Sequence, residues 1–417
     1  MHYPRRSFAL ALFVLVGLTL TVTLPHSPIG WVTCVLAAGD SPKYNGPAAC
    51  SAQECHGSTV PKGDGRTVHN EYALWVKNDR HSKAYASLGS PKGIQIAQRM
   101  KIQGDPRKAD RCLTCHTLNA TKDQQGNKYD VADGVSCDAC HGSSEKYLEP
   151  HSKSRPEHKN WTRAQSLAAG MTDTLDLAVR ANICVRCHLA IDHDMLEAGH
   201  PYMTFELDAH QVRLPPHWKR EAPFVATKAW AAGQAVALRD SLKQLNHRVE
   251  ANASSEYVEN ALKLCLAYYS TVRRLAEQVL PDSMKSIDAE ISWLRGAAPA
   301  NKDRVRSAAT PAFQDKLYDL AKRLGAIDFN AETNKKLMLS YASATEDMEN
   351  CESIDCAEQI FFAIDSLYRP YAQTVQPKNI TDMGIVMDKL ESLIKTPKTF
   401  KVEEFNTVLK DFAKYLQ

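Results

Sequence analysis

The sequence predicts a mainly α protein in two parts, a loop-rich N-terminal part followed by an α-helical bundle. Strand-like alternation of polar and apolar residues is scarce along the chain. Residues 39–222 are rich in Gly, Pro, Asp and His with little sustained periodicity, whereas residues 223–417 contain several long amphipathic stretches. The 417 residues suffice for two domains with cores of their own. We therefore predict a domain boundary between residues 222 and 223.

The first 38 residues have the pattern of an export signal. Arg5 and Arg6 form a basic start, and an uninterrupted run of apolar residues, Gly and Thr follows over Phe8–Leu24. Residues 35–38 end in two alanines and offer a cleavage site near residues 37–38, so we expect a periplasmic or otherwise exported chain. The alternative is an N-terminal membrane anchor, because the run is close to the length that spans a bilayer.

Three C-x-x-C-H segments dominate the N-terminal part, at Cys112–His116, Cys137–His141 and Cys184–His188. This pattern is the attachment signature of c-type haem. Two thiols three residues apart reach the two vinyl groups on one edge of a porphyrin, and the adjacent histidine lies under the iron as its first axial ligand. A zinc site would pair C-x-x-C units without an obligatory adjacent histidine, and a redox dithiol would not be repeated three times. We predict covalent haem at all three.

A fourth site precedes these at Cys50–His56, where four residues separate the two cysteines. The loop can bulge and still present both sulfurs, and Gly57 follows it as Gly142 follows the third site. The alternative is a small disulfide loop beside an incidental histidine. We predict four covalently bound haem c groups, with thioethers from Cys50, Cys55, Cys112, Cys115, Cys137, Cys140, Cys184 and Cys187 and iron ligands from His56, His116, His141 and His188.

Three further cysteines lie in the C-terminal part. Cys351 and Cys356 are close enough in sequence to form a disulfide in an oxidising compartment. Cys265 falls within an amphipathic helical pattern, which favours a buried apolar role.

The readable helices lie mostly in the C-terminal part. One early helix is predicted over Glu71–Leu88. Thr310 and Pro311 are a good N-cap and first residue of a later helix, and Gly325 is placed to end it. Apolar residues at spacings of three and four predict the remaining helices over 231–245, 258–279, 359–368, 383–394 and 403–416.

The second axial ligand of each iron decides what the protein can do. A second histidine saturates the iron and makes an electron carrier, whereas an open position permits substrate binding. The best additional candidate is His200, because Gly199 and Pro201 fix a tight, non-helical presentation; a solvent-exposed loop histidine is the alternative. Weaker candidates for a second axial ligand are His69, His158, His193 and His217. The other histidines available for this role are His81, His151, His210 and His247.

The order of these residues resembles the tetrahaem cytochrome c family whose best-known member accepts electrons from hydroxylamine oxidoreductase. The resemblance covers about residues 44–200 and includes Trp75, the Gly-Val-Ser sequence of residues 134–136 before the third site, and His151 after it. It implies that His81 caps the haem on His141 and that His151 caps the haem on His56. It also implies a bis-histidine fourth haem and a five-coordinate second haem. The first attachment spacing and the helical C-terminal half depart from the family.

These features favour an exported tetrahaem carrier that transfers single electrons through closely packed, mostly bis-histidine haems to redox partner proteins. The sequence contains no compelling catalytic residue set. The alternative is a haem enzyme that acts on a small nitrogen or sulfur compound at a five-coordinate haem, for which the one on His116 is the candidate. A formal net charge of +3 is too slight to indicate nucleic acid. The helical half could dock to a membrane-associated electron-transfer complex or form a homo-oligomer.

Overall fold

The computed structural model describes residues 41–62, 67–215, 223–296, 301–343 and 353–417. Within these ranges the chain is helical and has no strand, which confirms the predicted mainly α fold. No helix in the described ranges is long and apolar enough to cross a membrane. The predicted export signal lies outside the described residues.

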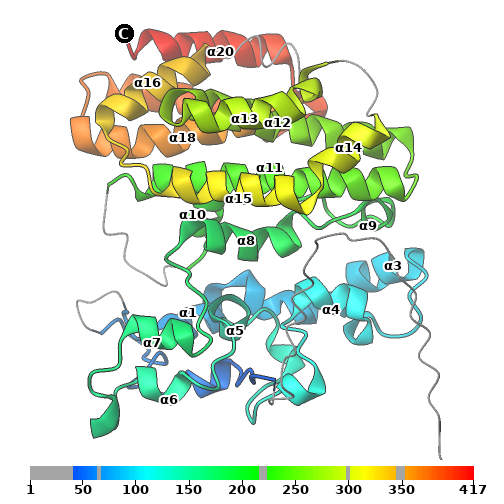
Figure 1. Cartoon of the computed structure of the whole chain (residues 1–417), viewed down its shortest axis with the longest axis vertical. Helices are drawn as coiled ribbons and strands as arrows, with labels where there is room; N and C mark the ends of the chain where they lie inside the picture. Colours follow the sequence, from blue (N-terminus) through cyan, green and yellow to red (C-terminus); the bar gives the residue numbers. More distant parts are fainter. Residues whose placement is uncertain (1–40, 63–66, 216–222, 297–300, 344–352) are drawn as a thin grey trace, which may run out of the picture. The chain divides into compact units, whose positions relative to one another are not determined.

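Short helices joined by loops make up residues 41–215 (Figure 1). Several begin with a side-chain cap: Ser90 accepts a hydrogen bond from Gly93 N, and Asp176 accepts from Ala178 N and Val179 N. In chain order the elements are η1 (Pro47–Ala49), α1 (Glu71–Asn78), η2 (Arg80–Lys83), α2 (Ala84–Leu88), α3 (Pro91–Arg99), η3 (Pro106–Lys108), α4 (Asp110–His116), η4 (Lys122–Gln124), η5 (Val131–Asp133), α5 (Cys137–His141), α6 (Leu148–His151), η6 (Pro156–His158), α7 (Arg163–Ala168), α8 (Leu177–His188), α9 (His193–Glu197) and α10 (Leu207–Arg213).

The single helix expected over Glu71–Leu88 is wrong, because the chain breaks at Asp79. This residue has extended backbone angles, and its carboxylate accepts a hydrogen bond from His81 N at the start of η2. A short acidic side chain that bonds the backbone two residues on competes with helix propagation. The apolar pattern continues through the break, so periodicity alone missed it.

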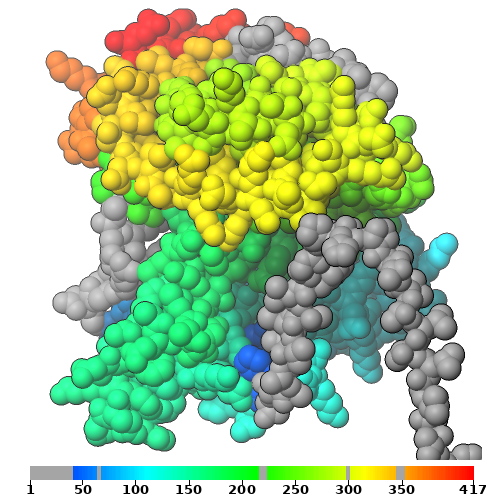
Figure 2. All heavy atoms as spheres, in the orientation of Figure 1, coloured from blue at the N-terminus to red at the C-terminus, as the bar shows by residue number. Residues whose placement is uncertain are grey.

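Longer helices make up residues 223–417, and α14 and α15 form a close-packed outer layer of this bundle (Figure 2). The predicted helix with Thr310 as N-cap and Gly325 at its end is confirmed as α15. The elements are α11 (Val225–Glu250), α12 (Ser255–Val279), α13 (Pro281–Ile291), η7 (Ser292–Arg295), α14 (Lys302–Ala308), α15 (Pro311–Gly325), α16 (Ala331–Ala342), α18 (Ile354–Val375), α19 (Ile380–Ile394), η8 (Pro397–Thr399) and α20 (Val402–Lys414).

Helix α11 is the centre of the hydrophobic core and contacts α8, α10, α12, α15 and α18. Its residues Trp230, Leu238 and Leu242 are fully buried. Gly233 lets α10 approach closely, since a Cβ at this position would lie 2.7 Å from the Cβ of Leu207. Helices α8 and α10 thus share a core with the bundle, although they precede the predicted boundary between residues 222 and 223. That boundary stays a prediction.

The cysteines of the C-terminal part fit their expected roles as far as they are described. Cys265 is fully buried as a free thiol, and burial raises its pKa to about 12, so the apolar interpretation is confirmed. Cys356 takes part in a disulfide. Cys351, its expected partner, lies outside the described residues.

Candidate functional site: haem attachment and axial ligands

Each of the three C-x-x-C-H segments forms the last part of an α-helix that ends at the histidine, in α4, α5 and α8. Residues three apart share a helix face, so one turn presents both sulfurs on the same side. All six cysteines are free thiols. Burial raises the pKa of Cys184 to about 12, which disfavours a thiolate and suits an uncharged thioether sulfur. These segments fit covalent haem.

The Cys50–His56 site reaches the same end by a loop. His56 N donates to Cys50 O over 3.2 Å, and Gly57 N donates to Ala52 O over 3.0 Å. These bonds fold the four intervening residues outward and bring both free cysteines next to the histidine. Gly57 is required sterically, because a Cβ there would lie 1.9 Å from the carbonyl oxygen of Ser51.

In three attachment histidines the Nδ1 atom contacts a possible hydrogen-bond acceptor, and the kind of acceptor differs among the three. His56 Nδ1 lies 3.0 Å from a carboxylate oxygen of Glu71. His116 Nδ1 lies 2.8 Å from the carbonyl oxygen of Ala84. His188 Nδ1 lies 3.2 Å from Nε2 of His210. A haem or metal histidine that donates from one nitrogen presents the other to the metal, so this pattern leaves the Nε2 atoms of His56, His116 and His188 for iron.

The contact between His56 and Glu71 is an ion pair when His56 is protonated. The hydrogen bond to Glu71 raises the pKa of His56, against burial. Burial alone would raise the pKa of Glu71, but hydrogen bonds from His56 and from the backbone N–H groups of Glu71 and Val68 outweigh it and lower that pKa. Glu71 is therefore a carboxylate at neutral pH and a strong acceptor for His56.

Three attachment histidines have another imidazole ring at nearly the same spacing. The centroids are 6.3 Å apart for His56 and His151, 6.4 Å for His116 and His200, and 6.2 Å for His81 and His188. His56 has a second neighbour in His69, at 6.4 Å. Two metal–nitrogen bonds of about 2 Å and two ring radii of about 1 Å each give about 6 Å for rings on opposite sides of one metal. The described rings therefore fit pairs of axial ligands.

The non-attachment partners in these pairs are also oriented through Nδ1. His151 Nδ1 lies 2.9 Å from Tyr147 O, and His200 Nδ1 lies 2.9 Å from Pro201 O. His81 Nδ1 lies 3.0 Å from Asp79, the residue that breaks the predicted helix, so the break also fixes this ring. The tight presentation expected of His200 has its cause in Gly199, whose φ is +94°.

Two pairs differ from what the resemblance implies. His81 lies beside His188 of the fourth site instead of His141 of the third. His200 lies beside His116, the ligand of the haem expected to be five-coordinate. The His56–His151 pairing is the one that the resemblance implies. His141 ends α5, and its carbonyl oxygen accepts from Thr172 N.

Of the weaker candidates, His69 lies 6.4 Å from His56 between ring centroids, and its Nδ1 contacts Cys55 O. His193 lies near His247, and His158 lies near Glu149. His217 lies outside the described residues. Sequence reasoning counted His210 among the available histidines but did not foresee its contact with His188, which depends on how α10 packs. The helical spacing between His210 and Glu206 is the only local signal, and it is common.

The attachment sites meet one another through their sulfurs. The Cys137 thiol hydrogen-bonds Cys50 and lowers the pKa of Cys50, and the Cys115 thiol hydrogen-bonds Cys187 and lowers the pKa of Cys187 to about 7. Thioether sulfurs do not titrate, so these contacts matter for their geometry. They join the first site to the third and the second to the fourth. Arg111 also links α4 to α9, through Asp192 at 3.0 Å and Asp194 at 2.6 Å.

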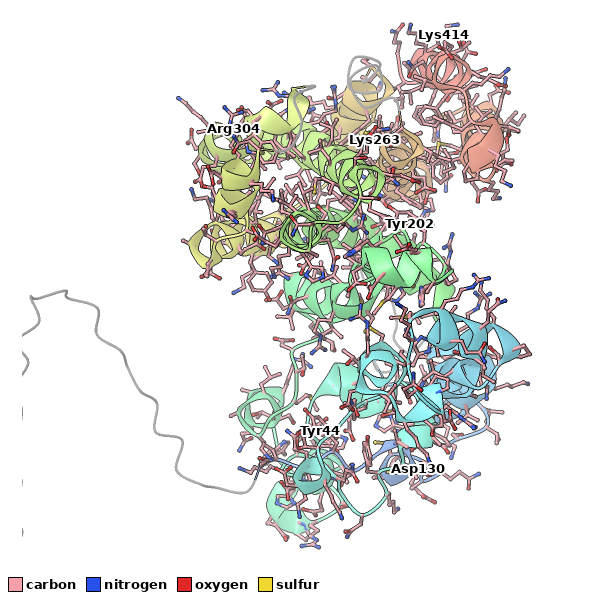
Figure 3. The ribbon with its side chains drawn as sticks, turned by 90° about the vertical axis from the view of Figure 1, so that its right-hand side faces the viewer. Tyr44, Asp130, Tyr202, Lys263, Arg304 and Lys414 are labelled. Atoms are coloured by element: carbon pink, nitrogen blue, oxygen red, sulfur yellow. The ribbon has the colours of Figure 1, made fainter. Side chains whose placement is uncertain are left out.

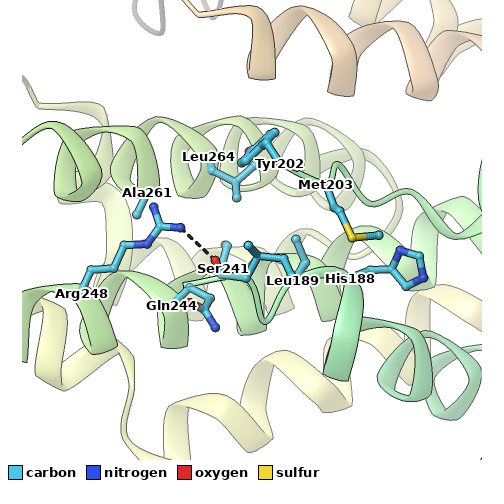
Figure 4. A pocket seen from close by; sticks show the side chains of 10 residues that line it. His188, Leu189, Tyr202, Met203, Ser241, Gln244, Arg248, Ala261 and Leu264 are labelled. Atoms are coloured by element: carbon cyan, nitrogen blue, oxygen red, sulfur yellow. Dashed lines mark hydrogen bonds between the residues drawn. The ribbon is translucent and has the colours of Figure 1, made fainter. Parts of the chain in front are cut away.

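A small cavity borders the fourth site (Figure 4). The Met203 side chain points toward the His188 ring, and Leu189 lies beside it. At the far end Arg248 is buried and donates to the carbonyl oxygens of Ile191 and Tyr257. Tyr202, labelled in Figure 3, also lines the cavity and donates to Asp355 of α18 over 3.0 Å. The cavity thus has an apolar end at His188 and a polar end at Arg248.

Comparison with known proteins gives one family. A family model described as cytochrome c554 and c-prime matches residues 49–142, which contain the first three attachment sites. No curated protein and no solved structure matches the chain. The match agrees with the cysteine and histidine geometry above, and it supports a c-type cytochrome region with covalently bound haem c over residues 49–142.

Proposed function

We propose that this chain is an exported tetrahaem cytochrome that carries single electrons between redox proteins. Bound haem c supplies a one-electron iron couple. The chain's part is to hold each haem by two cysteines, to supply its axial histidines, and to pack the attachment sites close together. The family match covers the first three sites, and the fourth has the same helix-terminal geometry in α8.

The observation that carries this proposal is that three of the four attachment histidines, His56, His116 and His188, have another imidazole 6.2 to 6.4 Å away between ring centroids. A second imidazole beside the attachment histidine fills the coordination position that a substrate would need. His200 beside His116 bears directly on the enzyme alternative, because the haem on His116 is the one that alternative requires to be open. The geometry thus favours the carrier.

The contacts between sulfurs suggest the route. The first and third sites meet at Cys50 and Cys137, and the second and fourth meet at Cys115 and Cys187. Cys140 of the third site is close enough to Cys184 of the fourth to disfavour its thiolate. We propose that electrons pass along the sites in the order first, third, fourth, second, or the reverse.

A basic segment next to the second site is the proposed docking surface for a redox partner. Residues 77–111 contain nine Lys and Arg, all exposed, against three Asp. Asp79 is buried against His81, Asp105 is paired with Arg107, and Arg111 is paired with Asp192 and Asp194 outside the segment. The segment carries His81 and the carbonyl of Ala84 that orients His116, so a partner docked here lies close to two ligands. An acidic redox protein fits this charge.

The docking proposal is tested with flavodoxin hydroquinone, an acidic protein reductant, as the probe. The double variant Lys92→Glu and Lys108→Glu should lower the bimolecular reduction rate about tenfold at low salt and weaken its salt dependence. Lys285→Glu with Arg304→Glu is the matched control, since both are exposed on the C-terminal helices. Equal effects of the two double variants would contradict the docking surface.

We further propose that the chain is periplasmic and that the C-terminal helices serve assembly, either as a homo-oligomer or with a membrane-associated electron-transfer complex. Light scattering of the full haem-loaded protein measures whether it forms a homo-oligomer. If the mass is that of a monomer, the proposal is reduced to a membrane-associated partner. Pull-down from solubilised membranes tests for that partner.

Carbon monoxide binding to the reduced wild-type protein tests the carrier function. Carbon monoxide needs an open iron position, so a carrier with saturated haems binds none or binds at a single site. Binding at the haem on His116, accompanied by turnover of nitrite or hydroxylamine, would replace the carrier with the enzyme.

A further inference from the structure

His210 of α10 lies directly behind the attachment histidine of the fourth site. The two ring centroids are 4.6 Å apart with ring planes at 89°, and His210 Nε2 lies 3.2 Å from His188 Nδ1. His81 lies 6.2 Å from His188 between centroids. His188 thus contacts one imidazole through its Nδ1 atom and has another at the spacing of an axial pair.

The backbone decides which nitrogen of His210 carries the proton. His210 Nδ1 lies 2.7 Å from the carbonyl oxygen of Glu206, which can only accept, and 3.4 Å from the N–H of the same residue, which is the longer and weaker contact. Nδ1 therefore carries the hydrogen, and Nε2 of the neutral ring has a lone pair. His188 Nδ1–H donates to that lone pair, which leaves Nε2 of His188 free to bind iron.

Helix α10 holds His210 rigidly. Glu206, which is fully buried, accepts hydrogen bonds from Asp208 N and Ala209 N at 2.8 and 2.5 Å and so fixes the start of the helix. Asp208 pairs with Arg369 of α18. Phe205, also fully buried, packs on the His210 ring with centroids 5.2 Å apart. The ring has little freedom to turn away from His188.

We infer that His210 is a positioning residue for the fourth haem: it fixes the orientation of the His188 ring and, as a neutral acceptor, makes that ring a stronger electron donor to iron. This rests on the proposed function, since it requires haem at Cys184 and Cys187. A stronger donor favours oxidised iron, so the fourth haem should have a lower potential than it would without the contact.

The test compares His210→Leu, which removes the acceptor, with His210→Gln, whose Oε1 can accept from His188. Redox titration followed by absorbance and low-spin electron paramagnetic resonance reads each haem. In the Leu variant, the reduction equilibrium of one haem should move about fivefold toward the reduced form, because one neutral hydrogen bond is lost. The resonance signal of the same haem should also change. The Gln variant should restore most of the wild-type reduction equilibrium and most of the wild-type resonance signal. His247→Leu, a histidine more than half exposed on α11, is the matched control and should change neither.

Peptide mass spectrometry separates failure of this inference from failure of the proposed function. Wild-type protein without haem on Cys184 and Cys187 would end the proposed function, whatever His210 does. Loss of this haem in the Leu variant, with retention in the Gln variant, supports positioning. Four haems with unchanged potentials and resonance signals in the Leu variant would overturn the role of His210 alone.

Discussion

His56 and His151 face each other with ring centroids 6.3 Å apart and ring planes only 10° apart. Their Nδ1 atoms are bound to Glu71 and to the carbonyl of Tyr147, so both rings present Nε2. Two histidines nearly a hundred positions apart in the sequence are thus placed so that they could hold one haem iron between them. His56, His116 and His188 have three different groups at Nδ1, so we expect these three histidines to differ in how strongly they donate charge to a bound iron.

Replacing Glu71 by Gln should raise the potential of one haem. A neutral amide polarises His56 less than a carboxylate does, so the ligand donates less charge to iron. The expected rise is about 40 mV, taking a loss of ~1 kcal/mol in one charge-assisted hydrogen bond. Spectroelectrochemical titration measures it. Glu157→Gln removes an exposed carboxylate in the same part of the chain and should leave all potentials in place.

Removing His200 should open one iron. In His200→Ala the reduced protein should bind one more carbon monoxide per chain than the wild type, and one haem should become high-spin, because His116 loses the ring beside it. Absorbance titration with carbon monoxide counts the sites. An unchanged count would show that His200 is a loop histidine and not a ligand.

Gly57→Ala should abolish attachment of the first haem while sparing the others. The added methyl group would lie 1.9 Å from Ser51 O, so the loop that gathers Cys50 and Cys55 cannot close. The intact mass should fall by one haem. Gly89→Ala is the control, since its nearest neighbours are the flexible tip of Arg107 at 3.4 Å. Retention of four haems in Gly57→Ala would contradict the steric account.

Stability should depend on pH through Glu358 of α18. Burial, and then Asp355, raise its pKa from 4.5 to about 7. Between these values the unfolded chain releases the proton and the folded chain keeps it, so stability falls as pH rises and the loss is complete above pH 7. The loss is at most about 3 kcal/mol.

Glu358→Gln should therefore be more stable than the wild type at pH 8 and equal to it at pH 4. Urea unfolding followed by circular dichroism measures the difference at the two pH values. Glu404→Gln, at an exposed position of α20, should show no such pH-dependent gain. A gain of equal size at both pH values would mean that burial of the charge is not the cause.

The attachment segments and the long helices were predictable because their signals are local. Thr310 and Gly325 mark the ends of α15 through capping chemistry that involves only neighbouring residues. The C-x-x-C-H segments were likewise predictable, because cysteines three residues apart share one face of a helix, and each segment lies within one helix.

The axial pairs and His210 were harder to predict because they depend on tertiary packing. His81 follows a break at Asp79 that the apolar pattern does not register, and it lies beside His188 instead of His141. His210 reaches His188 only because Gly233 admits α10 against α11. No periodicity within one segment encodes such a meeting of distant segments.

The number of haems per chain tests the central claim most directly. Intact mass spectrometry of the purified protein, combined with pyridine haemochrome quantification, gives that number. Four covalent haems on the eight cysteines of the attachment sites is the expected result. A mass equal to that of the bare polypeptide, or a haem count below four with Cys50 and Cys55 unmodified, would contradict it.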